Sequence, residues 1–363
     1  MIGTRPELIK LAPLAKALSG RGIGVSLILT GQHPDLDIEE HGLGTVPAER
    51  LGCAAAGDPH GHVRAVTTRL TPMLRTAQPS LLVVQGDTSS ALGGALAAKL
   101  AGIALAHVEA GLRSHDRTRP WPEEDFRIAI DREADLLFAP TALSAANLRR
   151  ERLNGAIECV GNTAIDAIAP YLGGGTRERR ERPRLLVTCH RRESWGDGLD
   201  RVAKALRAIA IDDIADVDVV LHPNPAVAGQ IVRLLGELRG VRLLAPCRHQ
   251  EMLAAMLGCD LLLSDSGGMQ EEAPALGVPL LVLRDRTERP EGIAAGNMVM
   301  VGTNPERIVA TVRRLLGHPD ALAAMSRPAF PYGPPGASEK IAAGIDRWLG
   351  DRSEKAEPVT EAA

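Results

Sequence analysis

Short, continuous apolar runs alternate with longer stretches of helical period along this 363-residue chain, and no other feature limits its fold as much. The apolar runs are rich in Val, Leu and Ile, and they lack the polar alternation of strands that face water on one side. Strands of this kind, each followed by a helix, form parallel sheets that are covered by helices on both faces. The sequence therefore predicts an α/β fold built from parallel sheets.

The predicted elements follow from that pattern. Strands are expected at residues 25–30, 81–85, 104–108, 136–139, 184–188, 217–221, 241–244, 261–264 and 280–283. Helices are expected at residues 90–100, 200–209, 226–238, 270–276 and 338–349. Three glycines at 173–175, followed by a stretch rich in Arg and Glu up to residue 184, indicate a polar hinge between two α/β halves. Residues 351–363 are charged and rich in Ala, which is typical of a disordered tail.

The composition excludes several classes of partner. A formal net charge of -3 argues against nucleic acid or an anionic membrane, and an aromatic content of 2% disfavours base stacking. The five cysteines form no CxxC pair, no apolar run is long enough to span a bilayer, and the N-terminus lacks a signal-peptide pattern. We therefore expect a soluble cytoplasmic protein without a disulfide framework or a zinc site.

Charged and imidazole side chains follow several predicted strands at the point where each strand ends. They are Asp87, Glu109, His190, His222 and Asp265. Ligands of open α/β sheets bind beyond the carboxyl ends of the strands, so two such domains facing each other would form one deep cleft. His190 also precedes Arg191 and Arg192, and an arginine pair binds diphosphates bidentately. A helix cap or a solvated loop would explain any single member, but the shared placement of five favours an active site.

Residues 265–272 predict the end of a strand, a Gly-Gly turn and a helix with early carboxylates. Gly267 and Gly268 would let the backbone approach a phosphate, and the helix N-terminus with the Ser266 hydroxyl would bind its oxygens. Glu272 would be placed to accept ribose hydroxyls, although glutamates also stabilise the first turn of any helix. The turn is neither a G-x-G-x-x-G motif nor a P-loop, so alone it is a weak signal.

Two further segments combine charges with the start of a helix. Arg5 and Lys10 follow a glycine turn, where the helix dipole disfavours cations unless an anion is bound. This conflict indicates diphosphate binding, with ordinary surface cations as the equally weighted alternative. Residues 123–125 are three acids behind Pro122, and their repulsion should raise the pKa of at least one carboxyl group, as an acid or base requires. The same acids are also typical of an ordinary first helical turn.

Taken in order, these segments resemble the non-hydrolysing UDP-N-acetylglucosamine 2-epimerases over residues 2 to about 336. The resemblance is carried by residues 3–7, 30–33, 86–88, 107–113, 120–124, 161–166, 190–194, 265–272, 287–291 and 331–333. It implies a glycosyltransferase-B-like pair of Rossmann-like domains, an active site in the interdomain cleft, and a homodimer. The first domain would comprise residues 1–170, joined by a C-terminal helix at about 334–350, and the second would comprise residues 183–333.

The resemblance also implies the reaction, which interconverts UDP-GlcNAc and UDP-ManNAc. UDP leaves C1 as the C2 proton is removed, which gives 2-acetamidoglucal, and UDP adds back as a proton reaches the other face of C2. Elimination is needed because no ring carbonyl activates the C2 proton. No nicotinamide, metal or other cofactor is required.

Single residues match roles in that family. Asp87, Glu109 and Glu123 match its proton-handling carboxylates. His190 matches its catalytic histidine. Because two faces of C2 must be served, at least two of these groups act as opposed acid and base. The residues matched to UDP-sugar binding are Arg5, Lys10, Arg113, Arg127, His222, Ser266, Gly267, Gly268, Glu272 and Arg289.

The chain departs from the family pattern in places. Its first two residues leave almost none of the strand that family members carry there, so the sequence is truncated, has a misassigned start, or tolerates the loss. Gln85 stands where many members have His. Pro34, Asp35 and Ala226 replace residues near the activating UDP-GlcNAc site of many bacterial members, which leaves allosteric activation open.

Three other functions compete with this one. The hydrolysing relatives, which release ManNAc and UDP, share the fold and the glucal intermediate, but the intact residues 5–7 and 122–124 favour the non-hydrolysing branch. A glycosyltransferase of the same architecture would not need Glu109 and Glu123. A catalytically silent nucleotide-sugar binder is disfavoured because no catalytic carboxylate is missing.

Overall fold

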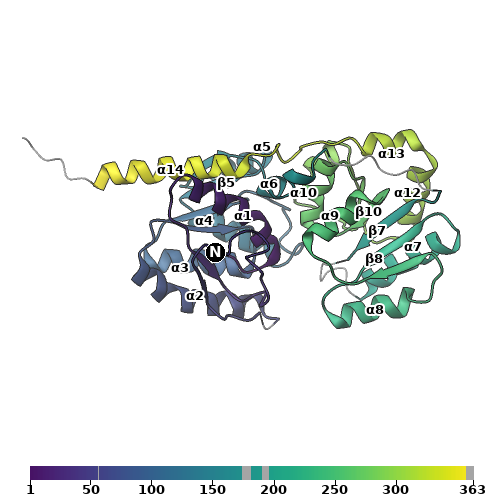
Figure 1. The fold of residues 1–363 in the computed structure, drawn as a ribbon, viewed down its shortest axis with the longest axis horizontal. Helices are drawn as coiled ribbons and strands as arrows, with labels where there is room; N and C mark the ends of the chain where they lie inside the picture. Colours follow the sequence, from purple (N-terminus) through teal and green to yellow (C-terminus); the bar gives the residue numbers. More distant parts are fainter. Residues whose placement is uncertain (56, 174–180, 190–195, 357–363) are drawn as a thin grey trace, which may run out of the picture. The chain divides into compact units, whose positions relative to one another are not determined.

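The computed structural model describes residues 1–55, 57–173, 181–189 and 196–356, and the chain divides into two compact units (Figure 1). Unit 1 comprises residues 1–167 and the segment from residue 332 onward, and unit 2 comprises residues 168–331. Both units contain parallel sheets, and helices connect most of their successive strands, so the predicted α/β fold is confirmed. Within the described ranges no helix is both long enough and apolar enough to cross a membrane.

The elements are named in chain order. Those of unit 1 are α1 (Arg5–Gly20), β1 (Leu27–Leu29), β2 (Ala48–Arg50), α2 (Pro59–Ala77), β3 (Leu82–Gln85), α3 (Ser89–Ala101), β4 (Leu105–Val108), α4 (Glu123–Glu133), β5 (Leu136–Ala139), α5 (Ala142–Arg150), β6 (Ala156–Cys159), α6 (Thr163–Ala167) and α14 (Ala337–Ala356). Those of unit 2 are η1 (Ala169–Tyr171), β7 (Arg184–Thr188), α7 (Asp197–Ile211), β8 (Asp216–Val220), α8 (Pro225–Leu235), β9 (Val241–Leu244), α9 (His249–Leu257), β10 (Leu261–Ser264), α10 (Gly267–Leu276), β11 (Leu280–Val282), α11 (Glu291–Ala294), β12 (Met298–Met300), α12 (Pro305–Gly317) and α13 (Pro319–Met325).

Unit 1 contains a four-stranded parallel sheet in the order β3-β4-β5-β6 and a two-stranded parallel sheet of β1 and β2. The first two residues join these sheets. The Ile2 N–H donates to the Ile28 carbonyl at 2.8 Å, and the Thr30 N–H donates to the Ile2 carbonyl at 3.0 Å. The α-ammonium group of Met1 donates to the Val83 carbonyl at 2.8 Å. Two residues therefore bridge β1 and β3 at the position of a central strand.

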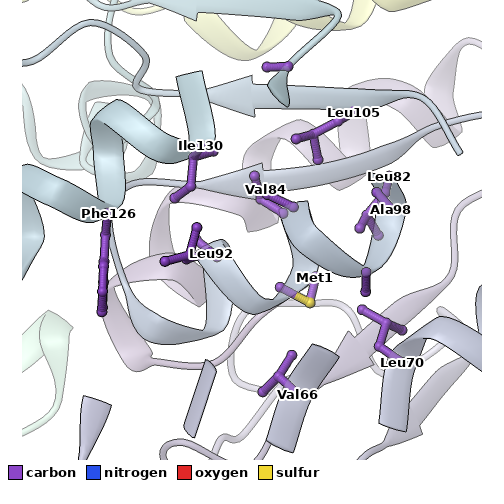
Figure 2. Close-up of a cluster of buried hydrophobic side chains, with 14 of the residues drawn as sticks. Met1, Val66, Leu70, Leu82, Val84, Leu92, Ala98, Leu105, Phe126 and Ile130 are labelled. Atoms are coloured by element: carbon purple, nitrogen blue, oxygen red, sulfur yellow. The ribbon is translucent and has the colours of Figure 1, made fainter. Parts of the chain in front are cut away.

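The Met1 side chain belongs to the hydrophobic core of unit 1. It lies among Val66, Val84 and Leu92, and 8% of its surface is exposed (Figure 2). Gly94 of α3 makes room for it, because a Cβ atom there would lie 2.3 Å from the Met1 methyl carbon. Burial lowers the pKa of the Met1 ammonium group from 8.0 to about 6, because the charged form loses its hydration.

The sheet of unit 2 has six parallel strands in the order β12-β11-β10-β7-β8-β9. Strand β10 is buried along its whole length, which explains why its apolar run shows no polar alternation. The strand order reverses between β7 and β10, and α/β sheets bind ligands beyond the strand ends at such a point. The Thr188 and Ser264 hydroxyls, which end these two strands, share a hydrogen bond of 2.7 Å.

Three strands were missing from the sequence prediction, and all three lie at sheet edges. They are β2, β6 and β12. Strand β2 is exposed at each of its residues, and β6 is exposed or half-buried throughout, so neither needs a continuous apolar run. Strand β12 has three residues, of which two are half-buried. An apolar-run criterion detects buried central strands and overlooks such edges.

Helix α14 packs against α1 and α6 of unit 1, and Figure 1 shows it alongside α1. Its Ile341, Ala342 and Ile345 are buried in the same apolar cluster as Leu8 and Leu14 of α1. The helix runs to Ala356, so the prediction that order ends near residue 350 was wrong. Residues 351–356 are mostly strong helix formers, and the Arg352 guanidinium lies 4.7 Å from the centre of the Trp348 ring. Residues 357–363 lie outside the described part of the chain.

Candidate active site

The Glu7 carboxylate joins two segments of unit 1, the start of α1 and the turn that follows β3. It accepts hydrogen bonds from the N–H groups of Gly3 at 2.7 Å and Thr4 at 2.5 Å. It also accepts from the Thr88 hydroxyl at 2.6 Å. Burial raises the pKa of Glu7, and these hydrogen bonds oppose the rise. Glu7 therefore fixes the start of α1 against the turn that carries Asp87.

Asp87 lies in that turn, two residues after the end of β3, and its carboxylate is paired with Arg127 of α4. The Arg127 Nε atom lies 3.0 Å from Asp87 Oδ2, and a second guanidinium nitrogen also contacts this oxygen. A further guanidinium nitrogen donates to Glu124 at 2.7 Å. Because Arg127 is only 2% exposed, it serves as a buried link between Asp87 and α4.

Glu109 follows β4 and is held by two buried donors. The Lys10 Nζ atom and the Gln85 Nε2 atom each lie 2.5 Å from Glu109 Oε2. Lys10 and Glu109 are 6% and 7% exposed, so Lys10 is not a surface cation. Arg5 differs, because it is exposed and its backbone N–H donates to His33 Nδ1 at 3.2 Å. The two cations that the sequence grouped together thus have different surroundings.

Glu123 is the first residue of α4 and is half-buried. Its neighbour Glu124 is buried and accepts hydrogen bonds from the N–H groups of Ser114 and His115, each at 3.0 Å. Glu124 therefore anchors the loop before α4, and Glu123 stands beside it at the start of the helix. The acidic triplet of the sequence contains residues with different surroundings.

A buried network of charges lies behind these loops. His107 Nδ1 is 2.7 Å from Asp131 Oδ1, and the Arg113 guanidinium is 2.7 Å from Asp131 Oδ2. Arg113 also makes a bidentate pair with Glu151 at 2.7 and 2.8 Å. Burial alone would raise the pKa of Asp131, but the charges and hydrogen bonds of His107 and Arg113 outweigh it and lower the pKa. Arg113 is thus bound within unit 1 by two carboxylates.

In unit 2 the predicted phosphate turn precedes α10, at the point where the strand order reverses. The Ser266 N–H donates to the Ser264 hydroxyl at 3.0 Å, and α10 begins at Gly267. A Cβ atom at Gly267 would lie 3.1 Å from the Arg289 guanidinium carbon, so glycine allows this arginine to approach the helix N-terminus. A Cβ atom at Gly268 would find nothing closer than 3.9 Å.

The other residues predicted in unit 2 lie near these elements. Arg289 donates to Glu271 of α10 at 2.7 Å and also contacts Glu288. Glu272 is 7% exposed, and its Oε1 atom lies 2.9 Å from His249 Nε2. His222 follows β8 and accepts a hydrogen bond from the Asn224 N–H at 2.9 Å. His190 lies outside the described residues.

Sequence reasoning singled out the proton-handling carboxylates and missed several residues that hold them. Glu7 was seen only as part of a motif, Gln85 only as a departure from the family pattern, and Asp131 was not noticed. The capping-box spacing of Thr4 and Glu7 was a usable signal for Glu7. Asp131 carried no such signal, because an acid in the last turn of a helix has no special meaning before its partners are known. Across the described residues, no three His, Cys, Asp or Glu side chains are grouped so that they could hold a metal ion.

Two units with parallel sheets place the chain in the α/β class with a glycosyltransferase-B-like fold, and that predicted fold class is confirmed by solved structures. The family model for UDP-N-acetylglucosamine 2-epimerase matches residues 16–346. The UDP-N-acetylglucosamine 2-epimerase of Escherichia coli K12 is 38% identical over 361 residues, which cover 94% of this chain and 96% of that protein. The chain belongs to the UDP-N-acetylglucosamine 2-epimerase family.

Two solved structures agree with this assignment. The UDP-GlcNAc 2-epimerase from Neisseria meningitidis, bound to UDP-GlcNAc, has a TM-score of 0.88 and 31% identity over 95% of this chain and 98% of that one. The Methanocaldococcus jannaschii enzyme, in complex with UDP-GlcNAc and UDP, has a TM-score of 0.83 and 32% identity over the same shares, 95% and 98%. The family resemblance predicted from the ordered motifs is therefore confirmed.

Proposed function

We propose that this chain is a non-hydrolysing UDP-GlcNAc 2-epimerase that interconverts UDP-GlcNAc and UDP-ManNAc. The observation that carries the proposal is the grouping in unit 1 of Asp87, Glu109 and Glu123 on elements that are tied together by buried hydrogen bonds. A reaction that removes a proton from one face of C2 and returns it to the other needs at least two such groups. The relatives named above act on or bind the same nucleotide sugar.

The proposed chemistry begins with elimination. A carboxylate takes the C2 proton, the C2–H electron pair forms the C1=C2 double bond, and the C1–O pair leaves with UDP. In the second half, UDP adds back to C1 and a carboxylic acid on the other side of the sugar protonates C2. Each proton transfer by a positioned carboxyl group contributes about 10²–10⁴-fold to the rate. We assign these transfers to Asp87, Glu109 and Glu123, and a further proton-transfer role to His190.

UDP binding is assigned to unit 2 and to cations of the proposed site. The N-terminus of α10 would bind the diphosphate through its free N–H groups, with Ser266 beside it. Glu272 would accept the ribose hydroxyls, with His249 orienting its carboxylate. Arg5, Lys10, Arg127, His222 and Arg289 would contribute charge and hydrogen bonds. The resemblance also leads us to expect a cytoplasmic homodimer, which light scattering and fractionation would test.

The deciding experiment is incubation with UDP-GlcNAc in deuterated water, followed by NMR. We expect deuterium at C2 of both UDP-GlcNAc and UDP-ManNAc, with the sugar still linked to UDP. Free ManNAc together with UDP would instead identify a hydrolysing enzyme. Binding of UDP-GlcNAc without any exchange at C2 would identify a silent binding protein and overturn the proposal.

A further inference from the structure

His107 of β4 has an oxygen acceptor at each ring nitrogen. Its Nδ1 atom lies 2.7 Å from Asp131 Oδ1, and its Nε2 atom lies 2.8 Å from the carbonyl oxygen of Gly86. His107 and Asp131 are both 0% exposed. A backbone carbonyl accepts hydrogen bonds and never donates them, so the Nε2 atom must carry a proton.

The hydrogen bond at Nδ1 reaches a carboxylate that other groups also hold. The second oxygen of Asp131 accepts from the Arg113 guanidinium at 2.7 Å and from the Gly111 N–H at 3.2 Å, an environment that favours an ionised carboxylate. The charge of Arg113 is balanced by Asp131 and Glu151. Through Asp131, the His107 ring is therefore tied to Arg113 and to the backbone at Gly111.

Three segments carry the proposed proton-handling carboxylates. His107 belongs to one of them and is hydrogen-bonded to the other two. The Gly86 carbonyl belongs to the turn before Asp87. Asp131 lies on α4, the helix that begins with Glu123. Glu109 follows His107 by two residues on the same chain, and its loop is tied to Asp131 through the Gly111 N–H. One buried histidine thus connects three separate pieces of backbone.

We propose that His107 is a positioning residue that sets the Asp87 turn, the Glu109 loop and the start of α4 in register for proton transfer at C2. This inference rests on the proposed function, because it takes the three carboxylates as the proton-handling set. His107 does not touch the reacting atoms. It acts through the Gly86 carbonyl and through Asp131, each of which is hydrogen-bonded to one of its ring nitrogens.

A matched pair of variants separates the two hydrogen bonds. The amide nitrogen of Asn matches the position of Nδ1, so His107→Asn keeps a donor for Asp131 and loses the bond to Gly86. The amide nitrogen of Gln matches Nε2, so His107→Gln keeps the bond to Gly86 and loses the bond to Asp131. Asp166→Ala serves as the control, because Asp166 lies in the same unit but holds the start of α14.

We expect amide hydrogen exchange to accelerate around residues 86–88 in His107→Asn and around the first turn of α4 in His107→Gln. The kcat of both variants should fall by about tenfold to a hundredfold with little change in KM, since a displacement of about 1 Å costs that much in a proton transfer. In deuterated water, the amount of deuterium at C2 of the recovered UDP-GlcNAc, divided by the amount at C2 of the UDP-ManNAc formed, should also change. This ratio reports which face of C2 still receives a proton. It does not depend on how much of the enzyme is folded.

The ring protons provide a direct test. Nitrogen-15 NMR of histidine-labelled enzyme should show a His107 ring proton that exchanges slowly with solvent, as buried hydrogen bonds to Gly86 and Asp131 require. This expectation holds whether or not the enzyme epimerises UDP-GlcNAc. Rapid exchange of the His107 ring protons with solvent would overturn the inference. The inference would also fail if the activity of both variants fell in proportion to their melting temperature, as expected for Asp166→Ala, while the exchange ratio stayed unchanged. Absence of C2 exchange in the unaltered enzyme would refute the proposed function while the NMR and amide exchange results still decide the role of His107.

Discussion

At the scale of single residues, Glu109 has a backbone that few glutamates adopt. Its φ of 71° lies in the left-handed region, which costs a residue with a side chain on the order of 1–2 kcal/mol. Lys10 and Gln85 bind its carboxylate, and its N–H donates to the Phe138 carbonyl at 3.1 Å. These contacts hold the carboxylate in place against the conformational preference of its own backbone. Such strain, when the surroundings maintain it, is typical of functional sites.

The first prediction concerns the three carboxylates. Asp87→Asn, Glu109→Gln and Glu123→Gln should each lower kcat by about a hundredfold or more, because each removes a proton-transfer group and leaves the side chain nearly isosteric. Calorimetric titration with UDP should give affinities close to that of the unaltered enzyme. Glu158→Gln is the matched control, since Glu158 is a carboxylate of unit 1 outside the proposed set and pairs with the exposed Arg347. Unchanged turnover in two of the three variants would refute the assignment.

The identities of the site residues were accessible from the sequence, but their pairing was not. Asp87, Glu109 and Glu123 could be named because they sit in family motifs at strand and helix boundaries. That Lys10 pairs with Glu109 depends on a contact between residues 99 positions apart. The helix-dipole argument weighed an external anion against an ordinary surface cation for Lys10, and neither interpretation anticipated an internal carboxylate. Tertiary contacts of this length are set by packing and leave no local pattern.

At the scale of elements, α14 depends on a residue far away in the chain. The Asp166 carboxylate accepts hydrogen bonds from the N–H groups of Gly336 at 2.5 Å and Ser338 at 2.6 Å, where the helix starts. Asp166 thus serves the N-terminus of a helix to which it does not belong, as a capping side chain does. The motif at residues 161–166, which the sequence associated with a family, has this structural role.

The second prediction tests that role. Asp166→Ala should reduce the free energy of unfolding by about 1–3 kcal/mol, because partly buried N–H groups lose their acceptor. Hydrogen exchange should locate the loss in α14. Asp346→Asn on the same helix is the control, and its exposed pair with Arg21 at 3.8 Å should contribute less than about 1 kcal/mol. Equal unfolding free energies for the Asp166 variant and the unaltered chain would show that α14 begins without this cap.

At the scale of the whole molecule, the two units differ in how they are encoded. Unit 2 is one continuous segment, residues 168–331, with its own apolar cluster. Unit 1 needs both ends of the chain, and its cluster around α1 includes Ile341 and Ile345 of α14. The sequence could predict most strands of both units, but the assignment of the last helix to the first unit came only through the family resemblance.

The third prediction follows from this difference. A fragment of residues 168–331 should fold alone and unfold cooperatively, because it contains a complete sheet and core. Residues 1–167 alone should bind hydrophobic dyes, and a peptide of residues 332–356 should reverse this by covering the exposed cluster. Circular dichroism and dye fluorescence would measure both effects. An unfolded 168–331 fragment would show that unit 2 depends on unit 1.

The contribution of α14 to unit 1 also bears on the order of events during translation. A ribosome releases residues 1–167 first, yet the cover for α1 emerges only after residues 168–331 have been made. At about 5–20 residues per second, this interval lasts on the order of 10–30 s. Throughout it the nascent chain displays an uncovered apolar surface, which a chaperone that binds such surfaces would recognise. Force measurements with arrest peptides placed after unit 2 and after α14 should detect two separate folding events, and a single early event would contradict this order.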